Sequence, residues 1–258
     1  MVRPKKHLGQ HFLTDKNIAQ KIVDCLDDQY SDVCEIGPGT GILTSPLLEK
    51  KPPIKNLKLI EVDRESIEYL EENFEDDRMN IIEADFLKLN IDEIFTTPFS
   101  LIGNFPYNIS SQIFFKVIEN RDRIPLVVGM IQKEVAERIA SPHGNKTYGI
   151  LSVFLQSWYE IEYCFTVHEN VFNPPPKVKS AVISLTRNST EKLDCDEKLF
   201  FRVVKMTFNQ RRKTIRNTLK SILPNITQSD HELFSKRPEQ LSPEQFVELT
   251  QVVESLLI

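Results

Sequence analysis

The sequence lacks the features that direct a chain into or across a membrane, because it has no run of about 18 apolar residues and no signal-peptide pattern. It also contains no internal repeat and no low-complexity tract. None of the paired spacings of a metal site occurs among its cysteines, which are Cys25, Cys34, Cys164 and Cys195. We therefore expect a cytoplasmic protein with reduced thiols, no bound metal and no membrane partner.

An excess of positive charge is also missing, since the net charge is −5 and the pI is near 5.7. Such a chain as a whole attracts phosphate weakly. The segment 202–220 nevertheless contains basic residues and no acidic one: Arg202, Lys205, Arg211, Arg212, Lys213, Arg216 and Lys220. Smaller basic clusters lie at 3–6 and 177–179. A solvated helix face could explain the run, but like charges without i,i+4 partners repel one another, which favours contact with phosphate.

The pattern of apolar residues predicts an α/β region followed by a helical one. Short apolar runs with the composition of buried strands alternate with helical patterns, and they lie at 33–36, 57–62, 79–84, 99–103 and 125–131. Residues 159–167 then alternate between the two faces of a strand, and 178–185 is their expected antiparallel partner. This order predicts a mostly parallel sheet with a terminal antiparallel hairpin.

A polar stretch without periodicity, 188–194, predicts a linker after the sheet. Beyond it the apolar spacing is helical, and residues 242–245 form a capping box that opens the last helix. A chain of 258 residues is long enough for one large and one small domain. We therefore expect a sheet domain over 1–187 and a small all-helical domain over 188–258.

A glycine-rich loop, Gly37-Pro38-Gly39-Thr40-Gly41, separates the first predicted strand from a helical run. Glycines at alternate positions let the backbone turn sharply and approach a ligand closely. The dinucleotide fingerprint needs a different spacing, Gly-x-Gly-x-x-Gly, with a pyrophosphate at the helix N-terminus. The loop therefore favours a ligand without phosphate.

Acidic residues follow the next two predicted strands. Glu61 and Asp63 stand where an acid binds ribose hydroxyls, although Asp63 could instead be a solvated cap of the next helix. Asp85 ends the third strand, where a carboxylate can accept a hydrogen bond from the amino group of an adenine. Because the carboxyl ends of parallel strands form one crevice, we expect these acids and the glycine loop to face one ligand.

The fourth strand ends in Asn104-Phe105-Pro106-Tyr107, a turn suited to the exocyclic amine of a nucleobase. That amine is a poor nucleophile, and a site that alkylates it must accept hydrogen bonds from its two N–H groups. Asn104 offers a side-chain oxygen, and a backbone carbonyl held rigid by Pro106 offers a second acceptor. Tyr107 adds a flat face on which a flipped-out base can stack. An ordinary Asn-x-Pro turn at a strand end is the alternative.

Three prolines, Pro174 to Pro176, stiffen the loop that joins the two strands of the predicted hairpin. Such rigidity fits a need to hold one side chain in place. Phe172 is the candidate, because turn residues flank it. The alternative is that Phe172 only plugs the hairpin.

Taken in order, these motifs resemble the class I S-adenosylmethionine-dependent methyltransferases that act on adenine N6. They resemble more closely the ribosomal RNA adenine dimethylase family, and within it the type that modifies small-subunit RNA. Residues 8–13 are similar to the segment of that family that closes over the methionine end of the cofactor, although many members have Asn where His11 stands. Residues 208–219 resemble its basic helix signature. The resemblance spans essentially the whole chain.

The resemblance implies a Rossmann-like class I methyltransferase domain followed by an RNA-recognition domain. It implies an enzyme that transfers methyl groups from S-adenosyl-L-methionine to N6 of two adjacent adenosines near the 3′ end of 16S ribosomal RNA. The partner would be small-subunit ribosomal RNA within a 30S assembly intermediate, and the enzyme would be a monomer. Large-subunit RNA dimethylation of the antibiotic-resistance type, DNA adenine methylation and a non-catalytic assembly factor are the alternatives. The last would have no use for Gly37, Glu61, Asp85 and Asn104.

The resemblance also assigns residues to roles. Catalysis is assigned to Asn104, Phe105, Pro106, Tyr107 and Phe172, with Phe172 stacking on the target base opposite Tyr107. Cofactor binding is assigned to Gln10, His11, Leu13, Gly37, Gly39, Gly41, Glu61, Asp85 and Asn104. Contact with the RNA backbone is assigned to Arg211, Arg212, Lys213 and Arg216.

Overall fold

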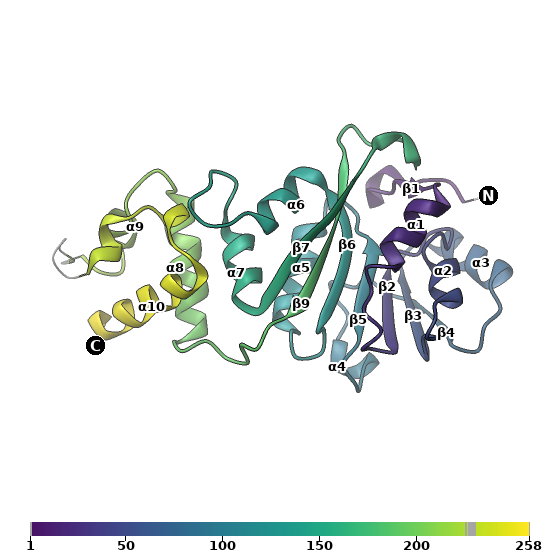
Figure 1. The fold of residues 1–258 in the computed structure, drawn as a ribbon, viewed down its shortest axis with the longest axis horizontal. Helices are drawn as coiled ribbons and strands as arrows, with labels where there is room; N and C mark the ends of the chain where they lie inside the picture. The colour runs from purple at the N-terminus through teal and green to yellow at the C-terminus, as the bar shows by residue number, and fades with distance from the viewer. Residues whose placement is uncertain (1, 225, 227–230, 258) are drawn as a thin grey trace. The chain divides into compact units, whose positions relative to one another are not determined.

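The chain forms two compact units in the computed structural model, which describes residues 2–224, 226 and 231–257 (Figure 1). The first unit runs from the N-terminal arm to Ala136 and also contains Ile161–Arg187. The second contains Glu137–Glu160 and the chain from Asn188 onward. The predicted division at 187/188 places the segment 137–160 in the sheet domain, whereas in the structure this segment belongs to the second unit.

The first unit is built on a mostly parallel sheet. Its described strands, in spatial order, are β4 (Met79–Glu83), β3 (Asn56–Glu61), β2 (Asp32–Ile36), β5 (Ser100–Asn104), β6 (Leu126–Gln132), β9 (Ser180–Arg187) and β7 (Tyr159–Val167). The pairs from β4 to β6 are parallel, and β9 runs antiparallel to β6. The predicted parallel sheet with a terminal hairpin is confirmed. Strand β9 lies between β6 and β7. It is therefore the expected partner of β7, and it also joins the hairpin to the parallel strands.

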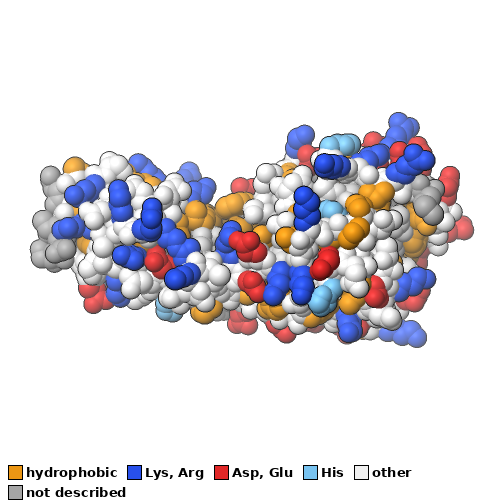
Figure 2. All heavy atoms as spheres, turned by 90° about the horizontal axis from the view of Figure 1, so that it is seen from above, with side chains coloured by type: hydrophobic (Ala, Val, Ile, Leu, Met, Phe, Trp, Pro, Cys, Tyr) orange, Lys and Arg blue, Asp and Glu red, His pale blue; other side chains and the backbone are white. Residues whose placement is uncertain are grey.

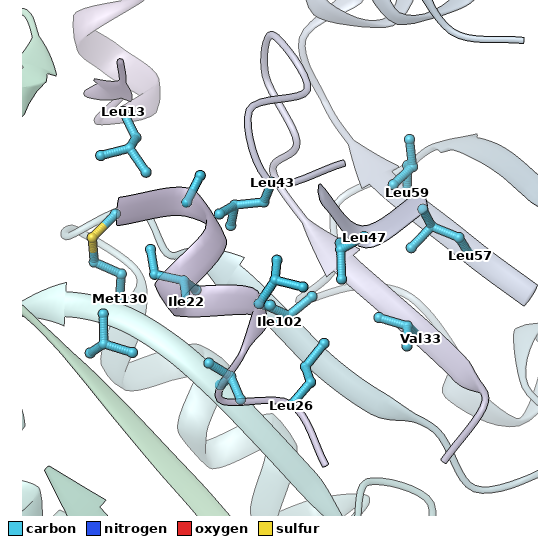
Figure 3. Packing of buried hydrophobic residues seen from close by; sticks show 14 of the residues in the cluster. Leu13, Ile22, Leu26, Val33, Leu43, Leu47, Leu57, Leu59, Ile102 and Met130 are labelled. Carbon is cyan, nitrogen blue, oxygen red and sulfur yellow. The ribbon is translucent and has the colours of Figure 1, made fainter. Parts of the chain in front are cut away.

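Helices α1 (Lys16–Val23) and α2 (Thr44–Glu49) enclose one hydrophobic core with the sheet (Figure 3). Strand side chains alternate between faces, so Leu57 and Leu59 both enter this core. Asp15 caps α1 by accepting hydrogen bonds from the backbone N–H groups at positions 17 and 18. Ile22 lies within the core, and this packing fixes α1 beside the sheet.

Four further helices belong to the connections of this sheet: α3 (Arg64–Asn73), α4 (Ile91–Ile94), α5 (Ser110–Glu119) and α6 (Lys133–Ala140). The predicted helix from position 133 is therefore present. The ring of Phe105, at the end of β5, packs edge-on against Phe114 of α5 with ring centroids 5.9 Å apart. A Cβ at Gly103 or Gly129 would lie 3.0 or 2.7 Å from that ring. These glycines leave a slot that seats Phe105 and holds the turn that follows β5.

The N-terminal arm is held by a two-stranded ribbon that the sequence patterns do not predict. Strand β1 (Phe12–Leu13) follows the short helix η1 (Lys6–Leu8) and pairs antiparallel with β8 (Phe172–Asn173). The short helix η2 (Glu169–Val171) precedes β8. The backbone N–H and the hydroxyl of Thr14 both donate to the Val171 carbonyl, at 2.8 and 2.9 Å. The arm and the proline loop are thus fastened together.

The second unit is helical in its described residues. It contains α7 (Ile150–Trp158), α8 (Glu197–Asn209), α9 (Ile215–Leu219), η3 (Glu232–Ser235), η4 (Pro238–Gln240) and α10 (Pro243–Leu257). Phe154 and Trp158 of α7 contact Phe200 and Phe201 of α8. This aromatic packing explains why α7 joins the helical unit. Within the described part of the chain, no helix is both long enough and apolar enough to cross a membrane.

Candidate active site

A cavity of about 430 Å³ lies at the carboxyl ends of β2, β3, β4 and β5, under the N-terminal arm. It is lined by all four residues of the turn 104–107 and by most of the residues predicted to bind cofactor: Gln10, His11, Gly37, Gly39, Glu61 and Asp85. The expected crevice at the carboxyl ends of the parallel strands is therefore present. Leu13, Gly41 and Phe172 do not line this cavity.

The glycine loop forms one wall of the cavity in a left-handed backbone conformation. Gly37 and Gly39 have φ values of 63° and 56°, which residues with a Cβ rarely adopt. A Cβ at Gly39 would lie 2.7 Å from the ring of Phe12. Phe12 therefore closes over the loop and lines the cavity, a role that the sequence patterns did not assign to it.

Glu61 joins the glycine loop to the end of β3. One carboxylate oxygen accepts the Gly39 N–H at 3.1 Å, and the other accepts those of Val62 and Asp63 at 2.8 and 2.9 Å. Burial raises the pKa of Glu61, and these backbone hydrogen bonds offset part of that rise. The oxygen that accepts from Gly39 keeps a lone pair, which can accept a hydroxyl of a ligand.

Asp63 is 2% exposed, so it is not a solvated residue, and it does not line the cavity. It caps α3 through the Glu65 N–H and accepts hydrogen bonds from Lys5 and Gln10 of the arm. Burial alone would raise the pKa of Asp63, but the hydrogen bonds, led by the one from Lys5, hold it below its usual value. Asp63 therefore anchors the arm over the cavity, whereas Glu61 faces the ligand space.

Asp85 lines the cavity just beyond β4. Its Oδ1 accepts the Leu87 N–H at 3.0 Å, and its Oδ2 lies 3.3 Å from the ammonium of Lys88. Asp85 is only partly buried, so the carboxylate can accept further hydrogen bonds from a ligand.

The side chain of Asn104 is oriented by the arm. Its Nδ2 donates to the backbone carbonyl of His11 at 2.8 Å. This bond uses the amide nitrogen, so Oδ1 keeps its acceptor capacity, as the predicted role requires. Within the described ranges, the backbone carbonyl of Phe105 accepts no hydrogen bond. The turn therefore offers two acceptors, one from a side chain and one from the backbone.

Tyr107 stands between this cavity and a second one. Its ring stacks on that of His11 with centroids 5.5 Å apart, and its hydroxyl pairs with Ser180. Burial raises the pKa of Tyr107.

Nδ1 of His11 donates to the carbonyl of Pro174 at 2.7 Å. The second cavity, of about 460 Å³, lies between the arm and the proline loop and shares His11 and Tyr107 with the first.

Two residues predicted for the site point into the core, and the roles assigned to them stay predictions. Leu13 and Phe172 are opposite each other in the β1–β8 ribbon, are 2% and 4% exposed, and belong to the core cluster with Ile22. Successive residues of a strand face opposite sides, so Phe12 faces the cavity and Leu13 does not. The burial of Phe172 agrees with the alternative interpretation, in which this ring plugs the hairpin.

Gly41 lies outside the cavity lining, next to the ring of Phe74. Its φ is 76°, and a Cβ there would lie 2.4 Å from the ring of Phe74. The position therefore requires glycine for the packing of the loop against that ring and not for contact with a ligand.

A second buried carboxyl group, that of Glu35, lies near the end of β2, two residues before the glycine loop. Glu35 is 1% exposed, and its Oε2 accepts the Thr44 hydroxyl at 2.7 Å. Burial raises the pKa of Glu35 to about 8. Glu35 is therefore mostly protonated at neutral pH and does not line the cavity.

The basic segment lies in the second unit and its members differ in environment. Arg212 and Lys213 are exposed, whereas Arg211 and Arg216 are partly buried. Arg211 donates to the Asn145 carbonyl at 3.2 Å and lies 3.9 Å from the carboxylate of Glu239, so it links parts of that unit. Arg212 and Lys213 are therefore better placed than Arg211 to meet a polyanion.

Charge is divided unevenly between the two units. The second contains 13 Lys and Arg against 12 Asp and Glu, and the first contains 19 against 25. Figure 2 shows Lys and Arg side chains gathered over the helical unit on the face in view. The negative total thus comes from the sheet unit.

In the described ranges, no three side chains of His, Cys, Asp or Glu gather in a way that could hold a metal ion. The cavity contains neither such a group nor the phosphate-binding spacing of a dinucleotide site.

The strand order and the glycine loop after β2 define a Rossmann-like class I methyltransferase fold. The structure is similar to that of a dimethyladenosine transferase from Plasmodium falciparum, with a TM-score of 0.82, 26% identity, and coverage of 96% of this chain and 99% of that one. It also has the fold of the 23S rRNA methyltransferase ErmE, with a TM-score of 0.71, 23% identity, and coverage of 94% and 99%.

Sequence comparison gives the family. The ribosomal RNA adenine dimethylase model matches residues 1–257. The chain is 58% identical to "Ribosomal RNA small subunit methyltransferase A" of Bacteroides thetaiotaomicron, over 100% of this chain and 96% of that protein. The chain belongs to the ribosomal RNA adenine dimethylase family.

Proposed function

We propose that this chain transfers methyl groups from S-adenosylmethionine to N6 of two adjacent adenosines near the 3′ end of 16S ribosomal RNA, twice per base. The observation that carries the proposal is the amide of Asn104, which lines the first cavity and is oriented by the His11 carbonyl. The name of the Bacteroides relative supports small-subunit ribosomal RNA as the substrate and argues against the large-subunit alternative.

The first cavity fits the cofactor. Glu61 has acceptor capacity for ribose hydroxyls, and Asp85 can accept the amino group of the adenine. Gln10, His11 and Phe12 come from the arm and would cover the methionine end. The cofactor carries no phosphate, which agrees with the spacing of the glycine loop and with the carboxylates in the cavity.

The target adenine would lie at the boundary between the two cavities, on Tyr107. Asn104 Oδ1 and the Phe105 carbonyl would accept the two N–H groups of the amine, aiming its lone pair at the methyl group. When bound, the cofactor supplies a methyl group on a positively charged sulfur, and loss of that methyl leaves a neutral thioether. No general base is needed, because the proton of the methylated amine can leave to water.

The helical unit would hold the RNA backbone. Arg212 and Lys213 are exposed cations without an acidic neighbour in the sequence from 202 to 220. Arg211 and Arg216, which are partly buried, would contribute less directly. We expect the enzyme to act as a monomer in the cytoplasm, on a 30S assembly intermediate, with the sheet unit as the catalytic part and the helical unit as the RNA-recognition part.

The test is mass spectrometry of small-subunit RNA from a strain lacking this protein. The RNA should gain dimethyladenosine when assembly intermediates are incubated with the purified protein and S-adenosylmethionine. If dimethyladenosine is already present, or if none appears on incubation, the proposal fails. RNA binding without methylation would favour a non-catalytic assembly factor on the same fold.

A further inference from the structure

The second cavity differs in charge from the first. Lys6 and Lys177 line it, and no Asp or Glu among the described residues does, whereas Glu61 and Asp85 line the first cavity. Both lysines are exposed, and neither forms an ion pair with a described residue. The two basic clusters at 3–6 and 177–179, far apart in the sequence, thus meet at one opening of a unit that is negatively charged as a whole.

The lysines stand on two segments that are fastened to each other. His11 donates to the Pro174 carbonyl, and strand β1 pairs with β8 just before the prolines. The three prolines restrict the backbone that carries Lys177. Lys6 belongs to η1, whose last residue is followed by Gly9 in a left-handed conformation. The backbone that carries each lysine is therefore restrained, whereas the exposed side chains can reach a ligand.

The rest of the cavity wall suits a sugar and a base. Its apolar part includes Val178, which is 46% exposed, and Pro175, and its polar part includes Gln132 at the end of β6. The volume of about 460 Å³ is within the range of small-molecule pockets, roughly 300–1,000 Å³, and can admit a single nucleotide. Tyr107 lines both cavities, so a base stacked there would leave its ribose and phosphates on the side of the second cavity.

We infer that Lys6 and Lys177 form a phosphate clamp, in which each ammonium binds a phosphodiester next to the nucleotide that enters the second cavity. This inference rests on the proposed function, and it specifies which phosphates of the RNA the sheet unit binds. An ammonium on a flexible stem binds phosphate as a point charge and needs no fixed geometry. The clamp would hold the target nucleotide, whereas the helical unit holds the surrounding RNA.

The clamp is tested with Lys6→Gln, Lys177→Gln and the double variant, and with Lys55→Gln as the matched control. Lys55 is also exposed in the sheet unit but lines a different cavity. At physiological salt, the double variant should raise KM for RNA about ten-fold and leave kcat within about two-fold, because the lysines touch no reacting atom. Its slope of log affinity against log salt should be smaller by about 1.4 for two single-strand phosphate contacts. S-adenosylmethionine affinity should not change.

A second measurement uses RNA in which the two phosphates flanking the target adenosine are replaced by uncharged methylphosphonates. The wild-type protein and the control should lose affinity for this RNA, whereas the double variant should lose almost none, because its clamp is already absent. An unchanged KM and slope in the double variant, or an equal loss of affinity in all proteins, would overturn the clamp. Methylation of natural RNA by the wild-type protein in the same assay separates that outcome from failure of the proposed function.

Discussion

Asn104 donates a hydrogen bond of 2.8 Å to the backbone carbonyl of His11, which lies 93 positions earlier in the chain. The bond crosses from the end of β5 to the N-terminal arm and fixes which atom of the amide faces the cavity. A backbone acceptor is independent of the side chain at position 11. The orientation of Asn104 is therefore compatible with His where many family members have Asn.

Asn104→Ala should lower methyl transfer on the order of 100-fold, because it removes an acceptor aimed at the reacting amine. Asn104→Asp keeps an acceptor but loses the N–H that binds His11, so it should also be strongly impaired. Cofactor affinity, measured by calorimetry, should stay largely intact in Asn104→Ala. Single-turnover rates within about three-fold of wild type would show that the turn has no catalytic role.

Glu61→Ala should weaken S-adenosylmethionine binding by roughly 1.5–3 kcal/mol, the scale of charge-assisted hydrogen bonds. Glu83→Ala is the matched control, because Glu83 pairs with Glu61 in the register of β3 and β4 but is exposed and does not line the cavity. Calorimetry should find the control equal to wild type. Equal affinities in the two variants would place Glu61 outside the cofactor site.

Glu35 should make stability depend on pH. Its pKa is raised to about 8 in the folded protein from an unfolded value near 4.5, so its stabilising contribution is complete below pH 4.5 and is lost as the pH rises toward 8. Glu35→Gln stays neutral throughout and can still accept from Thr44. Urea unfolding should find the variant more stable than wild type at pH 9 by roughly a few kcal/mol, with a smaller difference at pH 5. Parallel pH profiles for the two proteins would contradict this.

Phe172 and Tyr107 should respond differently to truncation. Phe172→Ala should lower the free energy of unfolding by roughly 3–5 kcal/mol, because it opens a hole in the core, and Phe172→Leu should retain most stability and activity. Tyr107→Ala should instead lose methyl transfer, and Tyr107→Phe should retain most of it because the ring remains. Unfolding curves and turnover separate the two effects. A stable but inactive Phe172→Leu would restore a direct role for Phe172.

The basic segment should divide into structural and RNA-binding positions. Replacing Arg212 and Lys213 with Gln should reduce the slope of log RNA affinity against log salt by roughly 1.4–1.8 without changing the melting temperature. Arg211→Gln should instead lower the melting temperature, since Arg211 links to Asn145 and Glu239 within the same unit. The reverse pattern would mean that Arg211, and not its neighbours, meets the RNA.

The sheet and the residues at the carboxyl ends of its strands could be predicted because each is marked by a pattern within a few neighbouring residues. Apolar runs locate each strand of the parallel sheet to within about two residues, and residues such as Glu61 and Asp85 line the cavity simply because they end those strands. The capping box at Ser242 is also confirmed, with Ser242 and Gln245 bonded in both directions.

The features that the sequence did not show depend on a partner far away in the chain. The ribbon of β1 and β8 turns Leu13 and Phe172 into the core, and no periodicity within two residues can show which side faces inward. The spacing of α7 predicts a helix but not that Phe154 and Trp158 pack on α8. The alternation of β1, once known, would have identified Phe12 as the cavity residue.

The space next to Gly39 is filled by the ring of Phe12. A side chain at position 39 would therefore meet two separate penalties, the left-handed backbone conformation and the contact with Phe12. A smaller residue at position 12 removes only the contact, so a library that varies 12 and 39 together should recover few folded variants beyond those of a library at 12 alone. In directed evolution of the cofactor site, position 39 is best kept as glycine and the variation placed at position 12.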